Sequence, residues 1–216
     1  MKLNKEELTY LREMIKTTSS KVLEKYKNQN VSSDYDYLFI GDSIIEYFNL
    51  KKYLPGINAI NRGVAGATTK FILDNLDTII DNIKPNEIFI SIGSNDLVLL
   101  EATVEEAYLG IVEVFEKLKL KYPETKINYL STTPVVSTSN VVYKKIYIGG
   151  RTNDELRLIN EKVKQYAKAN GINYIHLFDA LLDADGYLKS EFTADGIHLN
   201  SKGYEIYSNI IKSNIS

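Results

Sequence analysis

The stretch YLFIGDSIIEYF, residues 37–48, joins an apolar run to a second apolar run through Gly-Asp-Ser. Residues 37–41 predict a buried strand, and the pattern from Ile44 onward predicts a helix. Ser43 and Glu46 have the spacing of a capping box, so Ser43 is a good candidate for a helix N-cap. A serine at the end of a buried strand is also a candidate nucleophile. The stretch alone leaves both roles open.

The same alternation of apolar runs and helical patterns continues along the chain. Runs that are apolar on both faces and alternate with helices indicate a parallel sheet covered on both sides. We therefore predict an α/β protein, a three-layer α/β/α sandwich with a five-stranded parallel sheet. The expected strands are 37–41, 57–60, 86–92, 126–131 and 172–177, and the expected helices are about 44–53, 67–82, 103–121, 152–169 and 201–213.

An amphipathic helix is expected at the N-terminus, over residues 4–28. Its apolar positions recur at helical spacing and form one stripe. We interpret residues 1–30 as a helix packed on the domain and residues 31–216 as that domain. The alternative is that the helix is a dimerisation surface, so a homo-oligomer formed through it stays open. The residues of the stripe are Leu8, Leu11, Ile15, Val22 and Tyr26.

The composition of the chain excludes several classes of protein. A length of 216 residues, 44% of them hydrophobic, fits one domain with a sizeable core. A net charge of −2 gives no indication of a nucleic-acid partner. The absence of cysteine excludes disulfides and thiolate ligands. No run approaches the roughly 18 apolar residues of a membrane span. The charged N-terminus does not resemble a secretory signal, so we expect a cytoplasmic protein with no integral membrane segment.

Polar segments follow each expected strand. Open α/β sheets bind ligands beyond the carboxyl ends of their strands, so these segments should meet at one rim. They would bring together a hydroxyl, a glycine amide, a side-chain amide and a carboxylate–imidazole pair. The segments are GDS (41–43), NRGVAG (61–66), GSND (93–96), STTPVV (131–136) and DGIHLN (195–200).

These residue types are the ones that acyl transfer needs. A serine hydroxyl such as that of Ser43 attacks efficiently only when a base removes its proton, and a neutral imidazole such as that of His198 suits that task near neutral pH. A carboxylate three residues earlier, Asp195, is placed to orient the ring. The backbone N–H groups of Ser43 and Gly63, with the side chain of Asn95, are candidate donors to the oxyanion.

Each of these residues also has an ordinary structural interpretation. Gly63 can be a turn glycine, Asp195 a turn residue, and Asn200 the cap of the last helix. The other histidine, His176, lies in an apolar strand pattern and is expected to be packed and hydrogen-bonded. No H-x-x-x-H or similar spacing occurs, so no metal site is expected. The order of the segments after successive strands favours the functional interpretation.

The four segments FIGDSI, NRGVAG, GSND and DGIHLN resemble the sequence blocks of the SGNH (GDSL-type) hydrolase family. The resemblance covers about residues 36–213. It implies a flavodoxin-like SGNH hydrolase fold and hydrolysis of an ester through a serine-linked acyl-enzyme, without metal or cofactor. It assigns Ser43 as nucleophile, Asp195 and His198 as the other triad members, and Gly63 and Asn95 to the oxyanion hole. NRGVAGATT and RTNDELRLIN most resemble the small proteins similar to the platelet-activating factor acetylhydrolase catalytic subunits.

We therefore predict a serine esterase that acts on a small-molecule ester, with a short acyl chain on a lipid, a sugar or another alcohol, and that binds no nucleic acid. Two other functions stay open: an acyltransferase that uses the same triad, and a non-catalytic binding protein that retains the fold. Asp42 is expected to shape its turn and not to act as the triad acid. The segment 134–151 is either a mobile wall over the pocket or a plain surface loop.

Overall fold

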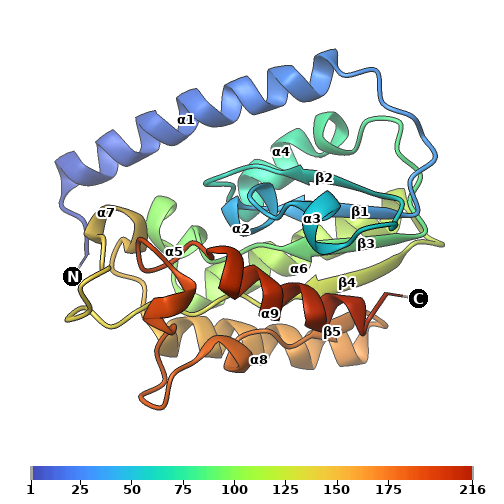
Figure 1. The fold of residues 1–216 in the computed structure, drawn as a ribbon. Coiled ribbons are helices and arrows are strands. Elements are labelled where there is room, and N and C mark those ends of the chain that lie inside the picture. The colour runs from blue at the N-terminus through green and yellow to red at the C-terminus, as the bar shows by residue number, and fades with distance from the viewer. Residues whose placement is uncertain (1, 216) are drawn as a thin grey trace.

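A five-stranded parallel sheet, with strand order β2-β1-β3-β4-β5, forms the centre of the computed structural model (Figure 1). The structure describes residues 2–215, so Met1 and Ser216, at the ends of the two predicted segments, lie outside it. The predicted α/β sandwich with an N-terminal helix is confirmed. The strands are β1 Tyr37–Gly41, β2 Ala59–Gly63, β3 Glu87–Ser91, β4 Lys126–Leu130 and β5 Asn173–Ile175.

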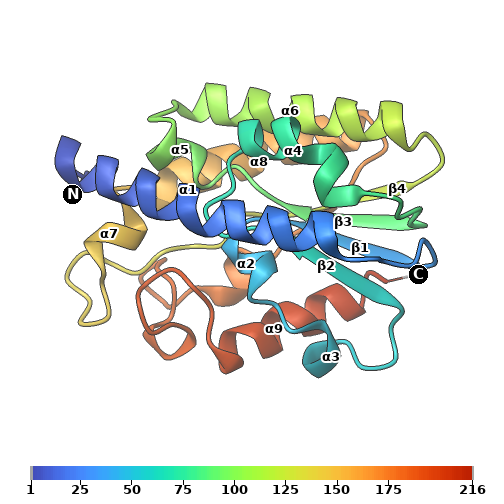
Figure 2. The ribbon, with the colours of Figure 1, turned by 90° about the horizontal axis from the view of Figure 1, so that it is seen from above.

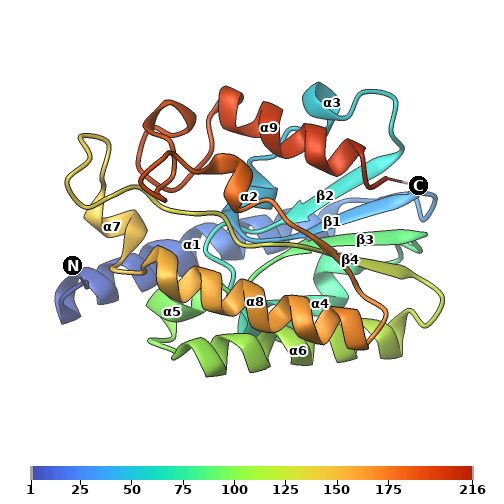
Figure 3. The same cartoon turned by 90° about the horizontal axis from the view of Figure 1, so that it is seen from below.

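Helices cover both faces of the sheet. Helices α4, α6 and α8 lie on one face, and α2, α3 and α9 lie on the other, as Figure 3 shows from below. Across residues 2–215, no helix has both the length and the apolar character needed to cross a bilayer. The helices are α1 Lys5–Asn28, α2 Ser43–Glu46, α3 Leu50–Tyr53, α4 Thr69–Ile80, α5 Asp96–Leu99, α6 Val104–Lys121, α7 Lys145–Ile148, α8 Asn153–Ala169 and α9 Ser201–Lys212, with short 3₁₀ turns at Asp179–Leu181 and Ser190–Phe192.

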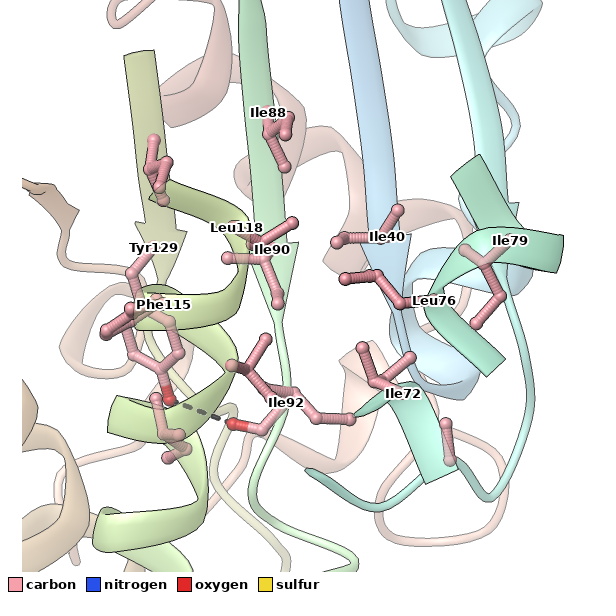
Figure 4. Packing of buried hydrophobic residues seen from close by; sticks show 14 of the residues in the cluster. Ile40, Ile72, Leu76, Ile79, Ile88, Ile90, Ile92, Phe115, Leu118 and Tyr129 are labelled. Carbon is pink, nitrogen blue, oxygen red and sulfur yellow. Dashed lines mark hydrogen bonds between the residues drawn. The ribbon is translucent and has the colours of Figure 1, made fainter. Parts of the chain in front are cut away.

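Alternate residues of the strands fill two separate apolar layers. Ile40 of β1 and Ile90 of β3 face α4 and α6 (Figure 4). Phe39 and Phe89, their neighbours in sequence, face the opposite layer, where their rings stack 4.8 Å apart. In the first layer, Tyr129 is buried among these side chains, and its hydroxyl donates to the carbonyl oxygen of Ile92 at 3.0 Å. Burial on both faces explains why the central strands read as continuous apolar runs.

The structure differs from the sequence prediction between β1 and β2. The single helix expected at about 44–53 is two short helices, α2 and α3, and the second strand is 59–63 and not 57–60. The side-chain amide of Asn61 donates to the carbonyl oxygens of Ile45 and Phe48, and Asn49 caps α3 by accepting from the N–H of Lys52. Asn61 thus binds one carbonyl of α2 and one carbonyl of the turn that follows it, where the chain leaves the helix.

Helix α1 lies along the outside of the domain, beside α4 and over α2 and β2 (Figures 1 and 2). It begins with a capping box formed by Asn4 and Glu7. An ion pair between Glu7 and Lys145, 2.7 Å apart, holds its first turns to α7. Near its other end, the hydroxyl of Tyr26 donates to the carbonyl oxygen of Gly63 at 2.7 Å. The predicted helix is therefore fixed to the domain near both ends.

Candidate active site

The turn between β1 and α2 presents Ser43 at the carboxyl end of the sheet. Gly41 ends β1 with φ +148°, and a Cβ there would lie 2.1 Å from the carbonyl oxygen of Ser91, so only glycine fits. Asp42 caps α2, because its Oδ1 accepts from the N–H of Ile44 at 2.9 Å. The interpretation of Ser43 as the cap is therefore wrong. Ser43 is instead the first residue of the helix, with its hydroxyl free for another partner.

The hydroxyl of Ser43 meets the imidazole of His198. Ser43 Oγ lies 3.0 Å from Nε2 of the ring, and Nδ1 of the ring lies 2.7 Å from Oδ2 of Asp195. The other carboxylate oxygen of Asp195 accepts from the N–H groups of His198 and Ile197 at 2.9 and 3.1 Å. Side chains from two predicted segments, 41–43 and 195–200, thus form one hydrogen-bonded series.

The environment of Asp195 keeps its carboxylate charged. Burial acts to raise its pKa, but the hydrogen bond from His198, the charge of that ring and the two backbone N–H groups outweigh burial. The net effect lowers the pKa of Asp195 to about 2. A carboxylate that stays ionised at neutral pH can hold the ring proton on Nδ1 and stabilise an imidazolium.

Two groups beside Ser43 can donate to an anion. Asn95 lines the same pocket, and its side-chain N–H₂ donates to the carbonyl oxygen of Ala67 at 3.0 Å, which leaves one hydrogen of the amide available. Gly66 also lines the pocket, and in the described part of the chain its backbone N–H and that of Ser43 have no acceptor. Donors without acceptors at a pocket wall are suited to an oxyanion.

Gly63 does not fit the role that the sequence predicted for it. Its N–H donates to Oδ1 of Asn61 at 2.9 Å, and the residue does not line the pocket. It is a glycine for a packing reason, since a Cβ there would lie 2.3 Å from the backbone nitrogen of Glu46. Gly66, three residues later, lines the pocket and is the candidate donor of this segment.

Arg151 is a residue that the sequence did not assign to the site. Its two terminal nitrogens each lie 3.4 Å from Oδ1 of Asn95, and one also donates to Ser94 Oγ at 2.7 Å. The remaining N–H groups donate to the carbonyl oxygens of Ile148 and Tyr147. Burial lowers the pKa of Arg151 to about 10, so the group remains charged at neutral pH. The positively charged guanidinium group attracts Oδ1 of Asn95, so the N–H₂ of that amide points away from the arginine.

A cavity of about 340 Å³ opens beside Ser43. Leu99, Tyr147 and Arg151 contribute to its walls, together with residues of α1. The segment 134–151 therefore supplies part of the pocket wall through its C-terminal residues, while its mobility stays a prediction. Tyr47 and Tyr147 approach the ring of His198 edge-on, with centroids 5.3 and 5.7 Å away.

The second histidine lies apart from this site. His176 is hydrogen-bonded, as predicted, through Nε2 to Asp179 at 2.8 Å, but its side chain is 47% exposed and not packed in the core. Asn200 caps α9, as predicted. Among residues 2–215, no three His, Asp or Glu side chains are grouped so that they could hold a metal ion.

Asp42 gives the stability of the protein a specific dependence on pH. Burial raises the pKa of its carboxyl from 3.8 to about 6, against the opposing effects of the Ile44 N–H and the Arg151 charge. The folded protein thus binds this proton more tightly than the unfolded chain, so the free energy of unfolding falls as the pH rises from about 4 to about 6.

Asp42→Asn keeps an oxygen for the cap and removes the ionisation. The free energy of unfolding of the variant minus that of the wild type should increase by up to ~3 kcal/mol as the pH rises from about 4 to 7, because only the wild type loses stability through this carboxyl. Urea unfolding of both proteins across this range measures the difference. A difference that does not change with pH would contradict the raised pKa.

The parallel sheet brings a serine hydroxyl, an imidazole and a carboxylate into one hydrogen-bonded series at its carboxyl edge. The model of the GDSL-like Lipase/Acylhydrolase family matches residues 39–206. The chain therefore belongs to the GDSL-like lipase/acylhydrolase family.

Two curated proteins are similar to the chain over part of their length. An N-acylneuraminate cytidylyltransferase of Escherichia coli is 29% identical over an alignment of 191 residues that covers 86% of this chain. A GDSL esterase/lipase of Arabidopsis thaliana is 24% identical over an alignment of 189 residues that covers 78% of this chain. The chain spans only 41% and 60% of the lengths of these two relatives.

Solved structures have the same fold along almost the whole chain. A protein from Streptococcus pneumonia, provisionally described as a platelet activating factor, has a TM-score of 0.87 at 29% identity, with 98% of this chain and 99% of that chain covered. A GDSL-like lipase from Bacteroides thetaiotaomicron has a TM-score of 0.71 at 21% identity, with 93% and 96% covered. The second likeness shows the fold alone.

Proposed function

We propose that this protein is a serine esterase that hydrolyses carboxylic esters through an acyl-enzyme on Ser43. The observation that carries the proposal is the series Ser43–His198–Asp195, with distances of 3.0 and 2.7 Å, beside unpaired N–H donors. Nε2 of His198 accepts the proton of Ser43 while Oγ attacks the ester carbonyl. Asp195 holds the ring in the tautomer that leaves Nε2 free to accept.

The tetrahedral intermediate carries its negative charge on the former carbonyl oxygen. The N–H groups of Ser43 and Gly66 and the side-chain amide of Asn95 are the proposed donors to this oxyanion. Arg151 orients Asn95 for this role. Its guanidinium group binds Oδ1 of Asn95 and so keeps that oxygen away from the negative charge. Collapse of the intermediate expels the alcohol, which takes the proton from His198.

Deacylation repeats these steps with water as the nucleophile. His198 removes a proton from the water, the same donors hold the second oxyanion, and Ser43 leaves with the proton. We propose a short acyl chain, since a cavity of about 340 Å³ is near the lower end of the range for small-molecule sites.

The acyl-enzyme gives the most direct test of this function. The wild type, mixed with p-nitrophenyl acetate and quenched in acid, should carry an acetyl group on the peptide that contains Ser43, as detected by mass spectrometry. Continuous assays should show release of p-nitrophenol. A protein that neither turns over a panel of esters nor forms an adduct would instead fit a non-catalytic binding protein.

Asn95→Ala should lower kcat about 10²–10³-fold, because it removes a donor that acts on the charge of the transition state. KM should change little, since a neutral ester carbonyl gains less from the same donor. Steady-state kinetics on p-nitrophenyl acetate measure both constants. Asn75→Ala, on α4 outside the pocket, serves as the matched control and should have wild-type kinetics. A loss confined to KM would contradict the assignment.

A further inference from the structure

The inner face of helix α1 forms one wall of the active-site cavity. From Leu11 to Val22 the wall runs over about 16 Å, at a rise of 1.5 Å per residue. The family match begins at residue 39, so this wall comes entirely from outside the matched segment. The α1 residues that line the cavity are Leu11, Met14, Ile15, Thr18, Ser19 and Val22.

Part of the inner face of α1 is not packed against the domain. The buried residues of the helix are Leu8 and Leu11 at one end, Ser19 in the middle and Tyr26 at the other end. Met14, Ile15 and Val22 belong to the inward side of the helix but are only partly buried. They face the cavity, so an apolar ligand there would gain contact with three apolar side chains.

Ile15 lies directly beside the reacting centre. A Cβ on Gly66 would approach the side chain of Ile15 to 2.5 Å, so the isoleucine packs against the proposed oxyanion donor. The leaving oxygen of an ester must instead face His198, which supplies its proton, between Tyr47 and Tyr147. With the carbonyl oxygen at Gly66 and the alcohol at His198, the remaining substituent, the acyl chain, is left to occupy the rest of the cavity, which α1 lines.

We propose that the inner face of α1 is the acyl-binding wall and that Met14 and Ile15 limit the length of the acyl chain. The proposal rests on the proposed esterase function and adds the part of the substrate that this surface recognises. The expected ligand is an apolar acyl group, because the α1 wall offers chiefly apolar side chains.

The test uses two series of esters and four variants of the full chain. One series holds the p-nitrophenyl group constant and varies the acyl group from acetate to octanoate. The other holds acetate constant and varies the alcohol. Ile15→Ala and Met14→Ala enlarge the cavity and should each raise the ratio of kcat/KM for hexanoate over acetate about 10-fold. The order of the alcohols in the acetate series should stay unchanged.

Two matched controls separate cavity size from loosening of the helix. Leu8→Ala removes a buried contact of α1 that does not line the cavity, and Tyr10→Ala changes an exposed side chain of the same helix. Both should keep the wild-type ratio of hexanoate to acetate, even if Leu8→Ala lowers the melting temperature.

The outcomes distinguish the two proposals. If Ile15→Ala and Met14→Ala leave the acyl ratio unchanged, or change the alcohol series instead, the acyl wall is wrong and the esterase function stands. A shift of the same size in Leu8→Ala also contradicts the wall, because helix position alone would then explain it. A wild type that hydrolyses no ester in either series overturns both proposals.

Discussion

Ser43→Ala should lower kcat about 10^6-fold, because the nucleophile and its base act as a unit and neither accelerates the reaction alone. The variant should fold normally, since alanine is smaller and a good helix former at the first residue of α2. Turnover of p-nitrophenyl acetate measures the loss, and the melting temperature confirms the fold. A fluorophosphonate probe should label the wild type and not the variant.

Two further variants serve as comparisons for Ser43→Ala. Ser43→Ala/His198→Ala should be no slower than Ser43→Ala, as expected for groups that act together. Ser208→Ala, which changes a buried serine of α9 that bonds only within its own helix, should keep full activity. Wild-type turnover by purified Ser43→Ala would show that the nucleophile lies elsewhere.

Asp195→Asn should lower kcat about 10^4-fold with little change in structure. The amide oxygen can still accept from the N–H groups of Ile197 and His198, which places the amide nitrogen opposite Nδ1 of the ring. The ring proton then moves to Nε2, which faces the hydroxyl of Ser43. Protonated Nε2 can no longer accept the proton of that hydroxyl. Kinetics measure the loss, and imidazole ¹⁵N shifts report the change of tautomer.

The chain offers a matched control for Asp195. Asp179 and His176 form a second carboxylate–imidazole pair with the same spacing of three residues, remote from Ser43. Asp179→Asn should therefore leave kcat unchanged. A loss of less than about 10-fold in Asp195→Asn would mean that another group orients His198, which the tautomer measurement would show independently.

The sequence predicted the layers of the fold because its central strands are buried on both faces. Residues 37–41 and 126–131 read as apolar runs between amphipathic helices, and they form β1 and β4 almost as predicted. The prediction failed where distant side chains decide the local structure. No local pattern shows that Asn61 donates to the carbonyls of Ile45 and Phe48, where the chain leaves α2, and the expected helix at 44–53 was too long.

The sequence also predicted which segments meet at the site. Ser43, His198 and Asp195 come together because parallel strands end at the same edge, although their catalytic roles stay a proposal. The predicted oxyanion role of Gly63 was wrong, because the spacing of glycines in a sequence does not reveal which backbone N–H already has an acceptor. The contact between the guanidinium group of Arg151 and the side chain of Asn95 was not predicted, because the two residues are 56 positions apart in the sequence.

Two predictions, on the oligomeric state and on the cellular location, concern more than the structure of a single chain. Self-association through α1 and a cytoplasmic location remain predictions from the sequence. The inward face of α1 packs on the domain, so a dimer through this helix would have to use its outward face, where Tyr10 is exposed.

The position of α1 affects how substrate preference can be transferred between relatives. Matching residues 39–206 aligns the proposed nucleophile, base and acid, but it compares nothing of the helix that covers them. With α1 as the proposed acyl-binding wall, two relatives that share every reacting group should still accept different acids if the chain before the first strand differs. Grafting residues 1–30 from one homologue to another would be the economical way to redirect such an enzyme.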